Sequence, residues 1–408
     1  MSHDLATAVD PGAGRPRSDG SSDRPIFSAS EIIRRQREIV RRLEAECVVI
    51  PSFHSSYYAS GFPMRQFGRW SVTILFKEHP PALIVPVFEL SGARRQSPIA
   101  DIRTYDDSRP PIPSVVRVVA EILGERRVSV VGIEGEGANY AMTVALASAL
   151  PRLELRDETA AIDAVRLVSS PEEVGLLRMA SEIADAGMTA MLSSLRFGVA
   201  ETDVAAAGMR RMEDLSEEGF DVQGFCYMQQ NERTAECHAS AHQVPIGRKG
   251  FVELLAECEV WHYQASIERP VLLGVPDERL DRIYDTSLEA ARAARAAVKP
   301  GATFAQVDAA SRDVLIAGGL TNVMSGAGLV RNVLHHTGGR MAAGDLRPYN
   351  EQTLRPGMTL TIEPWSLVDG VGGVRFCDPL VVTETGHERL ADTHDGRLRL
   401  TTTAVERE

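Results

Sequence analysis

The sequence predicts an α+β protein of two domains, and three observations lead to that prediction. The chain has 408 residues, which is enough for two or three separate cores. Its first part alternates short apolar runs with helical patterns, which is typical of an α/β domain. Near residues 160–170 the pattern changes to helices broken by strand-like segments. We therefore expect a smaller α/β domain over residues 26–165 and a larger domain over residues 166–408.

The composition excludes several classes of function. The net charge of −12 argues against nucleic acid or an anionic membrane as the main partner. No run approaches the roughly 20 apolar residues that span a bilayer, and the N-terminus lacks the apolar core of a signal peptide. The five cysteines are scattered without CxxC spacing, which is no disulfide framework. We expect a cytoplasmic protein.

The first domain can be followed element by element. Residues 1–25 are rich in Gly, Pro, Ser and Asp, and we expect a disordered tail there. Order should begin with a helix capped by Ser30, whose apolar side chains recur at helical spacing. After this helix we expect strands at residues 47–50, 71–76, 82–87 and 128–131, and helices at residues 114–123 and 140–150.

The second domain opens on a strong helix start and contains a weak internal repeat. Ser170 should cap a helix with Pro171 in its first turn and Glu173 completing a capping box, and the helix should run to about residue 195. Residues 195–204 and 298–307 are similar to one another, and each follows a long Ala-rich helix. The repeat indicates a pseudo-symmetric domain with a site between its halves, or a chance similarity between amphipathic helices.

The stretch from residue 328 to residue 364 concentrates chemical groups. It holds the pair His335 and His336, a Gly-Gly-Arg turn that ends at Arg340, and an apolar alternating run that should be a strand. Glu363 stands at the end of that strand, where a buried charge is costly unless another group pairs with it. A base, an arginine and a carboxylate therefore lie within one segment.

Four further groups stand out: residues 67–69 (FGR), 237–242 (CHASAH), 266–269 (SIER) and 375–378 (RFCD). Taken singly, each has an ordinary structural interpretation. A lone histidine is more often a hydrogen-bonded structural residue than a catalyst, and Glu268 beside Arg269 is typical of an ion pair. Cys377 is typical of a small buried apolar residue. Cys237, His238 and His242 have one helical zinc-ligand spacing, but no second cluster accompanies it.

Taken together, these motifs resemble the creatinase branch of the pita-bread superfamily, which includes methionine aminopeptidase and the proline-specific aminopeptidases. The resemblance covers about residues 28–395, and the intervals from His238 to Glu268 and from Arg340 to Glu363 match creatinase without a gap. It implies a pita-bread C-terminal domain preceded by a smaller creatinase-type N-terminal domain.

The metallopeptidase branch of this superfamily holds two metal ions with two Asp, one His and two Glu. Here the second Asp position is Ser266, the first falls in the apolar run near Leu255, and the His position is Leu329. Of the two Glu positions, Glu363 is kept and the other is Cys377. One carboxylate and one thiol cannot hold two divalent ions in an oxygen-rich cage. We therefore expect no metal site and no cofactor.

The resemblance to creatinase implies a role for each matching residue. His238 would be the general base that activates water and later protonates the departing nitrogen, with His242 as the alternative base. Glu268 and Glu363 would hold a planar cationic amidine or guanidinium group. These assignments predict metal-independent hydrolysis of a C–N bond in a small zwitterion that carries a guanidino or amidine group and a carboxylate.

The carboxylate of that substrate would be held by Arg340, together with Phe67 and Arg69 supplied by the partner subunit of a homodimer. His336 and Cys377 would line the pocket. Creatinase carries histidines at the positions of Cys377 and Leu329, so the resemblance does not fix creatine as the substrate. Two alternatives stay open: a metallo-aminopeptidase or prolidase-like enzyme with an altered metal site, and a non-catalytic protein that binds a ligand on the same fold.

Overall fold

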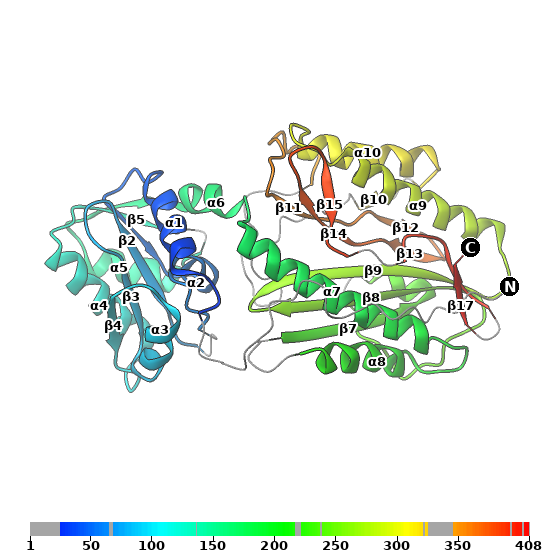
Figure 1. Cartoon of the computed structure of the whole chain (residues 1–408), viewed down its shortest axis with the longest axis horizontal. Coiled ribbons are helices and arrows are strands. Elements are labelled where there is room, and N and C mark those ends of the chain that lie inside the picture. The colour runs from blue at the N-terminus through cyan, green and yellow to red at the C-terminus, as the bar shows by residue number, and fades with distance from the viewer. Residues whose placement is uncertain are drawn as a thin grey trace.

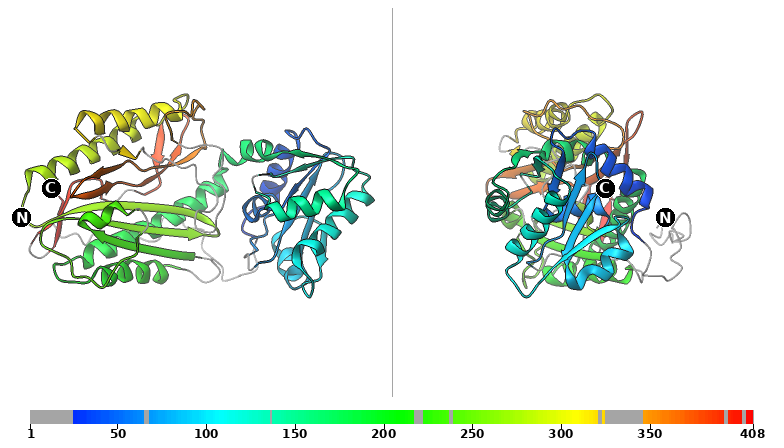
Figure 2. Two further views of the ribbon diagram at one scale, coloured as in Figure 1. Left: turned by 180° about the vertical axis from the view of Figure 1, so that it is seen from behind. Right: turned by 90° about the vertical axis from the view of Figure 1, so that its left-hand side faces the viewer.

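The structure is a computed structural model that describes residues 25–64, 68–135, 137–216, 222–236, 239–320, 323–324, 346–391, 394–401 and 404–407. Several predicted features lie outside these residues: the tail up to residue 24, Phe67, His238, Leu329, His336 and Arg340. The described residues form a smaller N-terminal body and a larger C-terminal body, which meet near α6 (Thr159–Arg166) and α7 (Pro171–Ser194), as Figures 1 and 2 show.

The smaller body is built on one sheet with the strand order β4-β3-β2-β1-β5-β6. Strand β1 lies at its centre, antiparallel to β2 and parallel to β5. The strands are β1 (Cys47–Ile50), β2 (Val72–Phe76), β3 (Ala82–Pro86), β4 (Asp101–Tyr105), β5 (Val130–Ile133) and β6 (Glu154–Asp157). Its helices are α1 (Ala29–Val40), α2 (Phe53–Ser60), α3 (Leu90–Gln96), α4 (Pro111–Glu125), α5 (Tyr140–Ala149) and α6.

Helix α1 begins two residues earlier than the sequence pattern predicts. Its N-cap is Ser28, whose side chain accepts a hydrogen bond from the Glu31 N–H at 3.2 Å, so the prediction of Ser30 was wrong. The same hydroxyl donates to Glu172 at the start of α7, 2.6 Å away. The cap is therefore chosen by a contact between the two bodies, which a local helix pattern does not contain.

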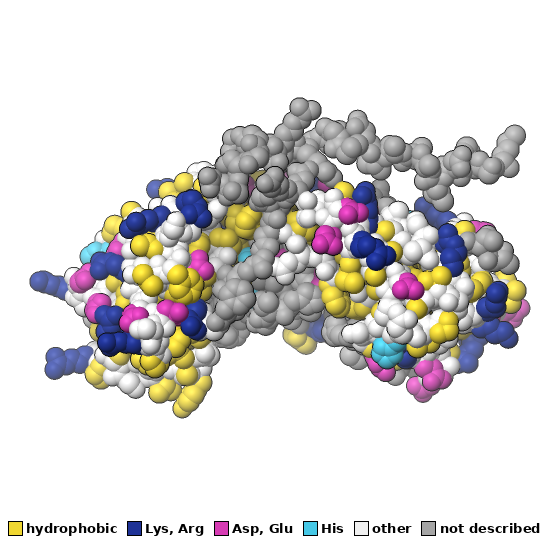
Figure 3. Space-filling model, turned by 90° about the horizontal axis from the view of Figure 1, so that it is seen from below, with side chains coloured by type: hydrophobic (Ala, Val, Ile, Leu, Met, Phe, Trp, Pro, Cys, Tyr) yellow, Lys and Arg dark blue, Asp and Glu magenta, His cyan; other side chains and the backbone are white. Residues whose placement is uncertain are grey.

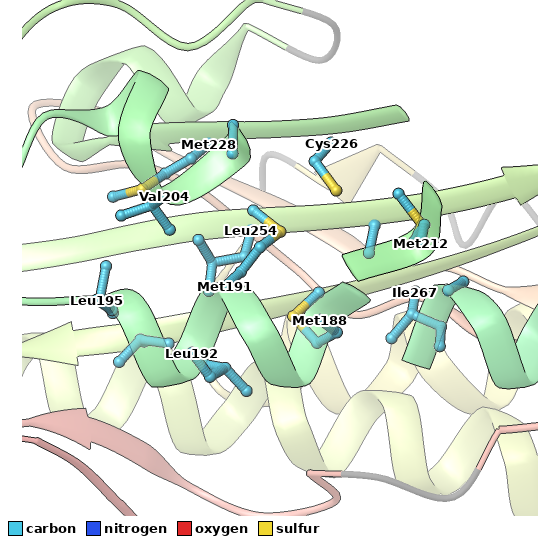
Figure 4. Close-up of a cluster of buried hydrophobic side chains, with 14 of the residues drawn as sticks. Met188, Met191, Leu192, Leu195, Val204, Met212, Cys226, Met228, Leu254 and Ile267 are labelled. Atoms are coloured by element: carbon cyan, nitrogen blue, oxygen red, sulfur yellow. The ribbon is translucent and has the colours of Figure 1, made fainter. Parts of the chain in front are cut away.

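The larger body is built around a sheet with the order β17-β16-β9-β8-β7. Its long strands are β7 (Val222–Gln230), β8 (Gly250–Val260) and β9 (Tyr263–Leu273), and its short ones are β16 (Leu398–Leu400) and β17 (Val405–Arg407). Helices α7 and α8 (Glu201–Asp214) cover one face of this sheet. The apolar side chains between them, among them Met188, Met191, Met212, Leu254 and Ile267, form the largest core cluster (Figure 4).

The second half of the larger body places another helix pair on the opposite side of the strands (Figure 1). Helices α9 (Glu278–Ala297) and α10 (Phe304–Ala317) follow β9 directly. Two small sheets accompany them. One has the order β10 (Val323–Met324), β12 (Trp365–Val368), β13 (Gly372–Arg375), and the other has β11 (Thr359–Ile362), β14 (Asp378–Val382), β15 (His387–Arg389).

The internal repeat corresponds to a repeated structure. In each copy a long helix ends, a turn with a glycine in the left-handed region follows, and a second helix begins. The glycines are Gly198 and Gly301, both with φ near +84°. The left-handed region costs an L-residue about 1 kcal/mol or more, which explains why glycine recurs at this place in both copies. The larger body is thus pseudo-symmetric in its helices.

Among the described residues, no helix combines the length and the apolar character that crossing a bilayer requires. On the face shown in Figure 3, basic and acidic side chains are interspersed. An interspersed distribution of charge creates no strong single-sign field over that face.

Candidate active site

The strands β8 and β9 form a hairpin whose two faces differ in chemistry. On β8, residues at even positions such as Leu254 and Cys258 pack into the core beneath α7 and α8. Residues at odd positions point to the other face, because side chains alternate along a strand. Those positions hold Glu253, Leu255 and Glu257, and β9 adds further polar residues. We call this polar side of the hairpin the site face.

The register of the hairpin places the residues of the site face on β8 directly opposite those on β9. Leu255 lies opposite Glu268, and Glu257 lies opposite Ser266. The Ser266 hydroxyl donates to Glu257 Oε2 at 2.5 Å, and all three polar residues are at least 95% buried. Carboxylates without water must be paired or hydrogen-bonded, so this face is built to hold charged groups.

A single guanidinium joins the two carboxylates that the sequence analysis singled out. Arg375 Nε lies 2.6 Å from Glu268 Oε2, and Arg375 Nη1 lies 3.5 Å from Glu363 Oε1. Tyr227 completes the cluster, because its hydroxyl is 2.8 Å from Arg375 Nη2 and 3.1 Å from Glu268 Oε1. We call these four residues the Arg375 cluster.

Arg375 is held in place from several sides. It is the last residue of β13, directly opposite Trp365, and its guanidinium carbon lies 5.2 Å from the centre of that ring. Its backbone N–H donates to Glu253 Oε2 at 3.1 Å. Burial alone would lower the pKa of Arg375, but Glu268, Tyr227 and the other acids around it together outweigh burial, and the pKa is held well above its usual value. The guanidinium is therefore a fixed positive charge.

The two carboxylates of the cluster differ in access. The predicted strand before Glu363 is observed as β11, and Glu363 follows it with 14% of its side chain exposed. The side chain of Glu268 is only 2% exposed and lies inside the sheet. Glu363 thus marks the side of the cluster that a ligand can approach, while Glu268 supports it from within.

Cys377 occupies a structural position beside Glu268. The two residues exchange backbone hydrogen bonds of 3.3 Å as an isolated bridge between β9 and the start of β14. The thiol donates to the carbonyl oxygen of Ser266 at 3.2 Å, and the residue is 1% exposed. Cys377 is therefore a buried neighbour of Glu268, and its thiol donates a hydrogen bond to the backbone.

Arg269 forms an ion pair with Asp378, with its Nη2 2.6 Å from Asp378 Oδ1, and its Nη1 donates to the backbone carbonyl of Glu268 at 2.7 Å. Arg295 and Arg389 reach the same Asp378 carboxylate at 2.6 and 3.1 Å. Burial would raise the pKa of Asp378, but the three guanidinium groups lower it to about 2. This second charge cluster ties β9, β14, β15 and α9 together beneath the site.

Two other predicted site residues lie away from the Arg375 cluster within this chain. Arg69 belongs to the smaller body and forms an ion pair with Asp107, with Nη2 3.2 Å from Oδ2. His242 is exposed, and its backbone N–H donates to Glu201 at 2.9 Å. Phe67, His238, His336 and Arg340 are outside the described residues, so the roles predicted for them stay predictions.

The structure also identifies site residues to which the sequence analysis gave no role: Tyr227, Glu253, Glu257 and Arg375. Arg375 stood in one of the motifs, but nothing in the sequence indicates which carboxylate it meets. The glutamates carried a usable signal, since residues 253, 257 and 259 are acids on one face of an otherwise apolar strand. Tyr227 carried none, because tyrosine is common in buried strands.

Comparison with known proteins agrees with this architecture. The model of metallopeptidase family M24 matches residues 175–384, and that of the creatinase/prolidase N-terminal domain matches residues 32–168. The Xaa-Pro dipeptidase of Pyrococcus furiosus is 28% identical over 316 residues, which cover 76% of this chain and 84% of that protein. A creatinase of Bacillus sp. is 26% identical over 388 residues, which cover 92% and 93%.

Solved structures show the same fold. An Xaa-Pro dipeptidase from Bacillus anthracis superposes with a TM-score of 0.79 at 24% identity, covering 91% of this chain and all of that one. The prolidase from Pyrococcus furiosus superposes with a TM-score of 0.72 at 26% identity, covering 86% and 97%. The predicted fold class, a pita-bread domain after a creatinase-type α/β domain, is thereby confirmed.

The residues that the sequence analysis assigns to the family's metal-ligand positions do not fit a pair of metal ions. Leu255 has no donor atom, and the Ser266 hydroxyl and the Cys377 thiol both donate hydrogen bonds. The remaining carboxylate, Glu363, faces the Arg375 guanidinium, which repels a cation. Among the described residues no group of three His, Cys, Asp or Glu is arranged to hold a metal ion.

Proposed function

Because the chain belongs to metallopeptidase family M24, we propose that it is a hydrolase that cleaves a C–N bond. Its substrate would be a small carboxylic acid that carries a guanidino or amidine group, and the reaction would use no pair of metal ions. One observation carries the proposal. The Arg375 guanidinium lies between Glu268 and Glu363, and the neighbouring ligand positions hold Leu255 and Ser266. Such a site presents carboxylates and a fixed positive charge to a substrate, and it contains few groups that bind a metal ion.

The charge of the Arg375 cluster suits a cationic substrate group. Two carboxylates and one guanidinium leave one negative charge in a buried environment. A buried net charge is costly, and a planar cation from the substrate would neutralise it. Glu363 is the accessible carboxylate and would contact the substrate. Glu268 is held by Arg375 and Tyr227, and its negative charge would attract the substrate's cationic group without contacting it.

The resemblance to creatinase supplies the remaining roles. His238 would take a proton from water as the water oxygen attacks the amidine or guanidine carbon. The same histidine would return that proton to the departing nitrogen as the C–N bond breaks, so that protons balance over the cycle. Arg340 would hold the substrate carboxylate in a bidentate contact.

We also propose a homodimer in which the partner subunit completes the site. Arg69 is about one-third exposed on the smaller body, where Asp107 orients its guanidinium. Within one chain it lies away from the Arg375 cluster, so a role at the substrate carboxylate requires a second copy. Mixing an inactive His238→Ala chain with an inactive Arg69→Ala chain should restore part of the activity. Each mixed dimer would then contain one intact site.

The direct test is incubation of the protein with creatine, other guanidino acids and cyclic amidine acids in the presence of a chelator. Release of amine, urea or ring-opened product supports the proposal. His238→Ala should abolish product formation while ligand-induced thermal stabilisation persists. Absence of both turnover and stabilisation across the whole panel would rule the proposal out.

A second candidate is an Xaa-Pro dipeptidase with an altered site. It is favoured by the curated relatives, because prolidases precede creatinase among them, although their identities of 26–28% are alike. This candidate predicts stoichiometric divalent metal in the purified protein, cleavage of dipeptides such as alanyl-proline, and loss of that cleavage on chelation. Elemental analysis together with the alanyl-proline assay separates the two functions.

A further inference from the structure

Glu253 is a carboxyl group in the interior to which the proposed reaction gives no role. It lies on the site face of β8 and is 1% exposed. One oxygen, Oε2, accepts the hydrogen bond from the Arg375 backbone N–H at 3.1 Å. The other, Oε1, is buried and has no hydrogen-bond donor among the described residues. A buried acceptor without a donor requires an explanation.

Gln229, the residue opposite Glu253, also has a buried oxygen without a hydrogen-bond donor among the described residues. It is the direct partner of Glu253 in the register of β7 and β8, so both side chains lie on the site face. The Gln229 Nε2 group donates to the Ala239 carbonyl oxygen at 2.6 Å, which fixes the orientation of the amide. Its Oε1 is then a buried acceptor that also has no donor in the described part of the chain. One hydrogen atom between the two oxygens would satisfy both.

The groups that face Glu253 determine where such a hydrogen would reside. Glu268 and Arg269 reach it from β9, Arg375 from β13 and the phenol of Tyr284 from α9, while Glu363 acts through Arg375. Burial raises the pKa of Glu253 well above its usual range, and the negative charge of Glu268 raises it further against the two arginines. The surroundings therefore favour the neutral form.

We propose that Glu253 is a neutral carboxylic acid that donates its hydrogen to Gln229 and, through the Arg375 backbone N–H, positions the guanidinium between Glu268 and Glu363. It is a positioning residue, since it acts on the substrate through Arg375. The proposed state of Glu253 is independent of the substrate, whereas its effect on catalysis rests on the proposed function.

A neutral Glu253 has a defined consequence for the site. With it, the Arg375 cluster carries one negative charge; an ionised Glu253 would add a second negative charge beside Glu268. The added charge would compete with Glu268 and Glu363 for the same guanidinium and displace it. Activity should therefore fall on the alkaline side as Glu253 loses its proton.

Infrared spectroscopy tests the state of Glu253 without any substrate. The C=O stretch of a protonated carboxylic acid is separate from carboxylate bands and should be present in the whole protein at pH 7. It should disappear in Glu253→Gln and remain in Glu257→Gln, the matched residue two positions along the same face, which accepts a hydrogen bond from Ser266. A spectrum unchanged by Glu253→Gln would overturn the proposal.

A second variant keeps the test decisive if Glu253→Gln fails to fold. Gln229→Leu removes the acceptor while preserving the size of the side chain, so the acid band should remain and shift in frequency. A band that does not move in Gln229→Leu would show that the hydrogen is not donated to Gln229, and would also overturn the proposal.

The positioning role is tested by rate against pH with whichever compound is turned over among creatine, the other guanidino acids, the cyclic amidine acids and alanyl-proline. Glu253→Gln keeps a neutral side chain of the same shape. It should stay within about threefold of the parent kcat at pH 7 and lose the alkaline decline. Glu253→Ala should lower kcat at least about tenfold. If the alkaline decline persists in Glu253→Gln, the positioning role is wrong. If none of these compounds reacts or stabilises the protein, the proposed function fails while the infrared result stands.

Discussion

At the scale of single residues, the site is organised by charges that pair across different strands. Arg375 is the residue on which most of these pairs depend, because it contacts Glu268, Glu363 and Tyr227 and is fixed through its backbone by Glu253. Removing it would leave Glu268 as a buried charge with a lost partner. Such losses are far more costly than the net strength of the pair.

Arg375→Ala should therefore lower the free energy of unfolding by about 3–5 kcal/mol. The exposed pair of Arg178 and Glu388 provides a matched control, since its side chains are 40% and 48% exposed. Arg178→Ala should change the free energy of unfolding by less than about 1 kcal/mol. Urea denaturation measures both, and equal losses for the two variants would contradict the central role of Arg375.

Asp378 gives a prediction about acid. Its pKa is lowered to about 2 in the folded protein, from 3.8 unfolded, so it contributes stability that is present above pH 4 and is lost as the pH falls through 2. Asp378→Asn should destabilise the protein by roughly 2 kcal/mol or more at pH 7. The difference from the parent protein should shrink between pH 4 and pH 2. A difference that stays constant over this range would contradict the pairing.

The candidate site could be predicted only in part from the sequence. The motifs identified Glu268, Glu363 and Cys377, and the structure brings these three together on neighbouring strands. The guanidinium that joins the two glutamates was not predicted, because motif spacing does not specify which side chains meet across separate sheets. Glu253 and Glu257 were missed since the strand was interpreted as apolar, although three of its alternating positions hold acids, at residues 253, 257 and 259.

At the scale of elements, capping boxes position the helices that frame the site. Ser170 and Glu173 form one at the start of α7, and Thr303 and Gln306 form another at the start of α10. Helix α8, by contrast, has Ala200 as its N-cap residue, whose side chain caps nothing, although its backbone is extended as a cap requires.

Two kinds of substitution test the caps: removing a capping side chain should destabilise the protein, and adding one should stabilise it. Ser170→Ala and Thr303→Ala should each lower the free energy of unfolding by about 1 kcal/mol, because each leaves a helix N–H without its acceptor. Ala200→Ser should raise it by up to about 1 kcal/mol. Thermal or chemical denaturation measures all three, and destabilisation by Ala200→Ser would show that a cap is not what α8 lacks.

Strongly apolar elements were predicted well, and half-exposed ones were not. The strand at 47–50 is β1 with unchanged bounds, and the pattern before Glu363 is β11. Strands β4 and β6 went unpredicted, because they lie at the edges of the sheet and alternate little between apolar and polar residues. Helix α2 was missed as well, since it is buried on all sides and has no polar face to reveal its period.

At the scale of the whole molecule, the two bodies are joined by a buried charge. Arg35 of α1 is fully buried; it lies 2.7 Å from Glu31 and 3.6 Å from Glu173 of α7, and its guanidinium stacks on Phe27 and Tyr58. The Tyr263 hydroxyl, from the hairpin, donates to the same Glu173 at 2.9 Å. The contact thus runs from the smaller body through α7 to the strands that carry the site.

Arg35→Ala should uncouple the bodies, so that calorimetry shows two thermal transitions in place of one. The neighbouring Arg34 is the natural control. It also pairs with Glu31, but its side chain is 45% exposed. Arg34→Ala should leave a single transition. A single transition in Arg35→Ala as well would mean that the remaining contacts, among them the one between Ser28 and Glu172, hold the bodies together.

The hairpin register has a consequence for how such a site can change over time. Glu268 and Glu257 stand directly across from Leu255 and Ser266, the two places at which relatives that use metal are expected to carry aspartates. An acid can therefore be gained on one strand before its counterpart is lost on the other. A lineage could exchange one set of acids for the other by single substitutions and never pass through an ancestor that lacked negative charge there.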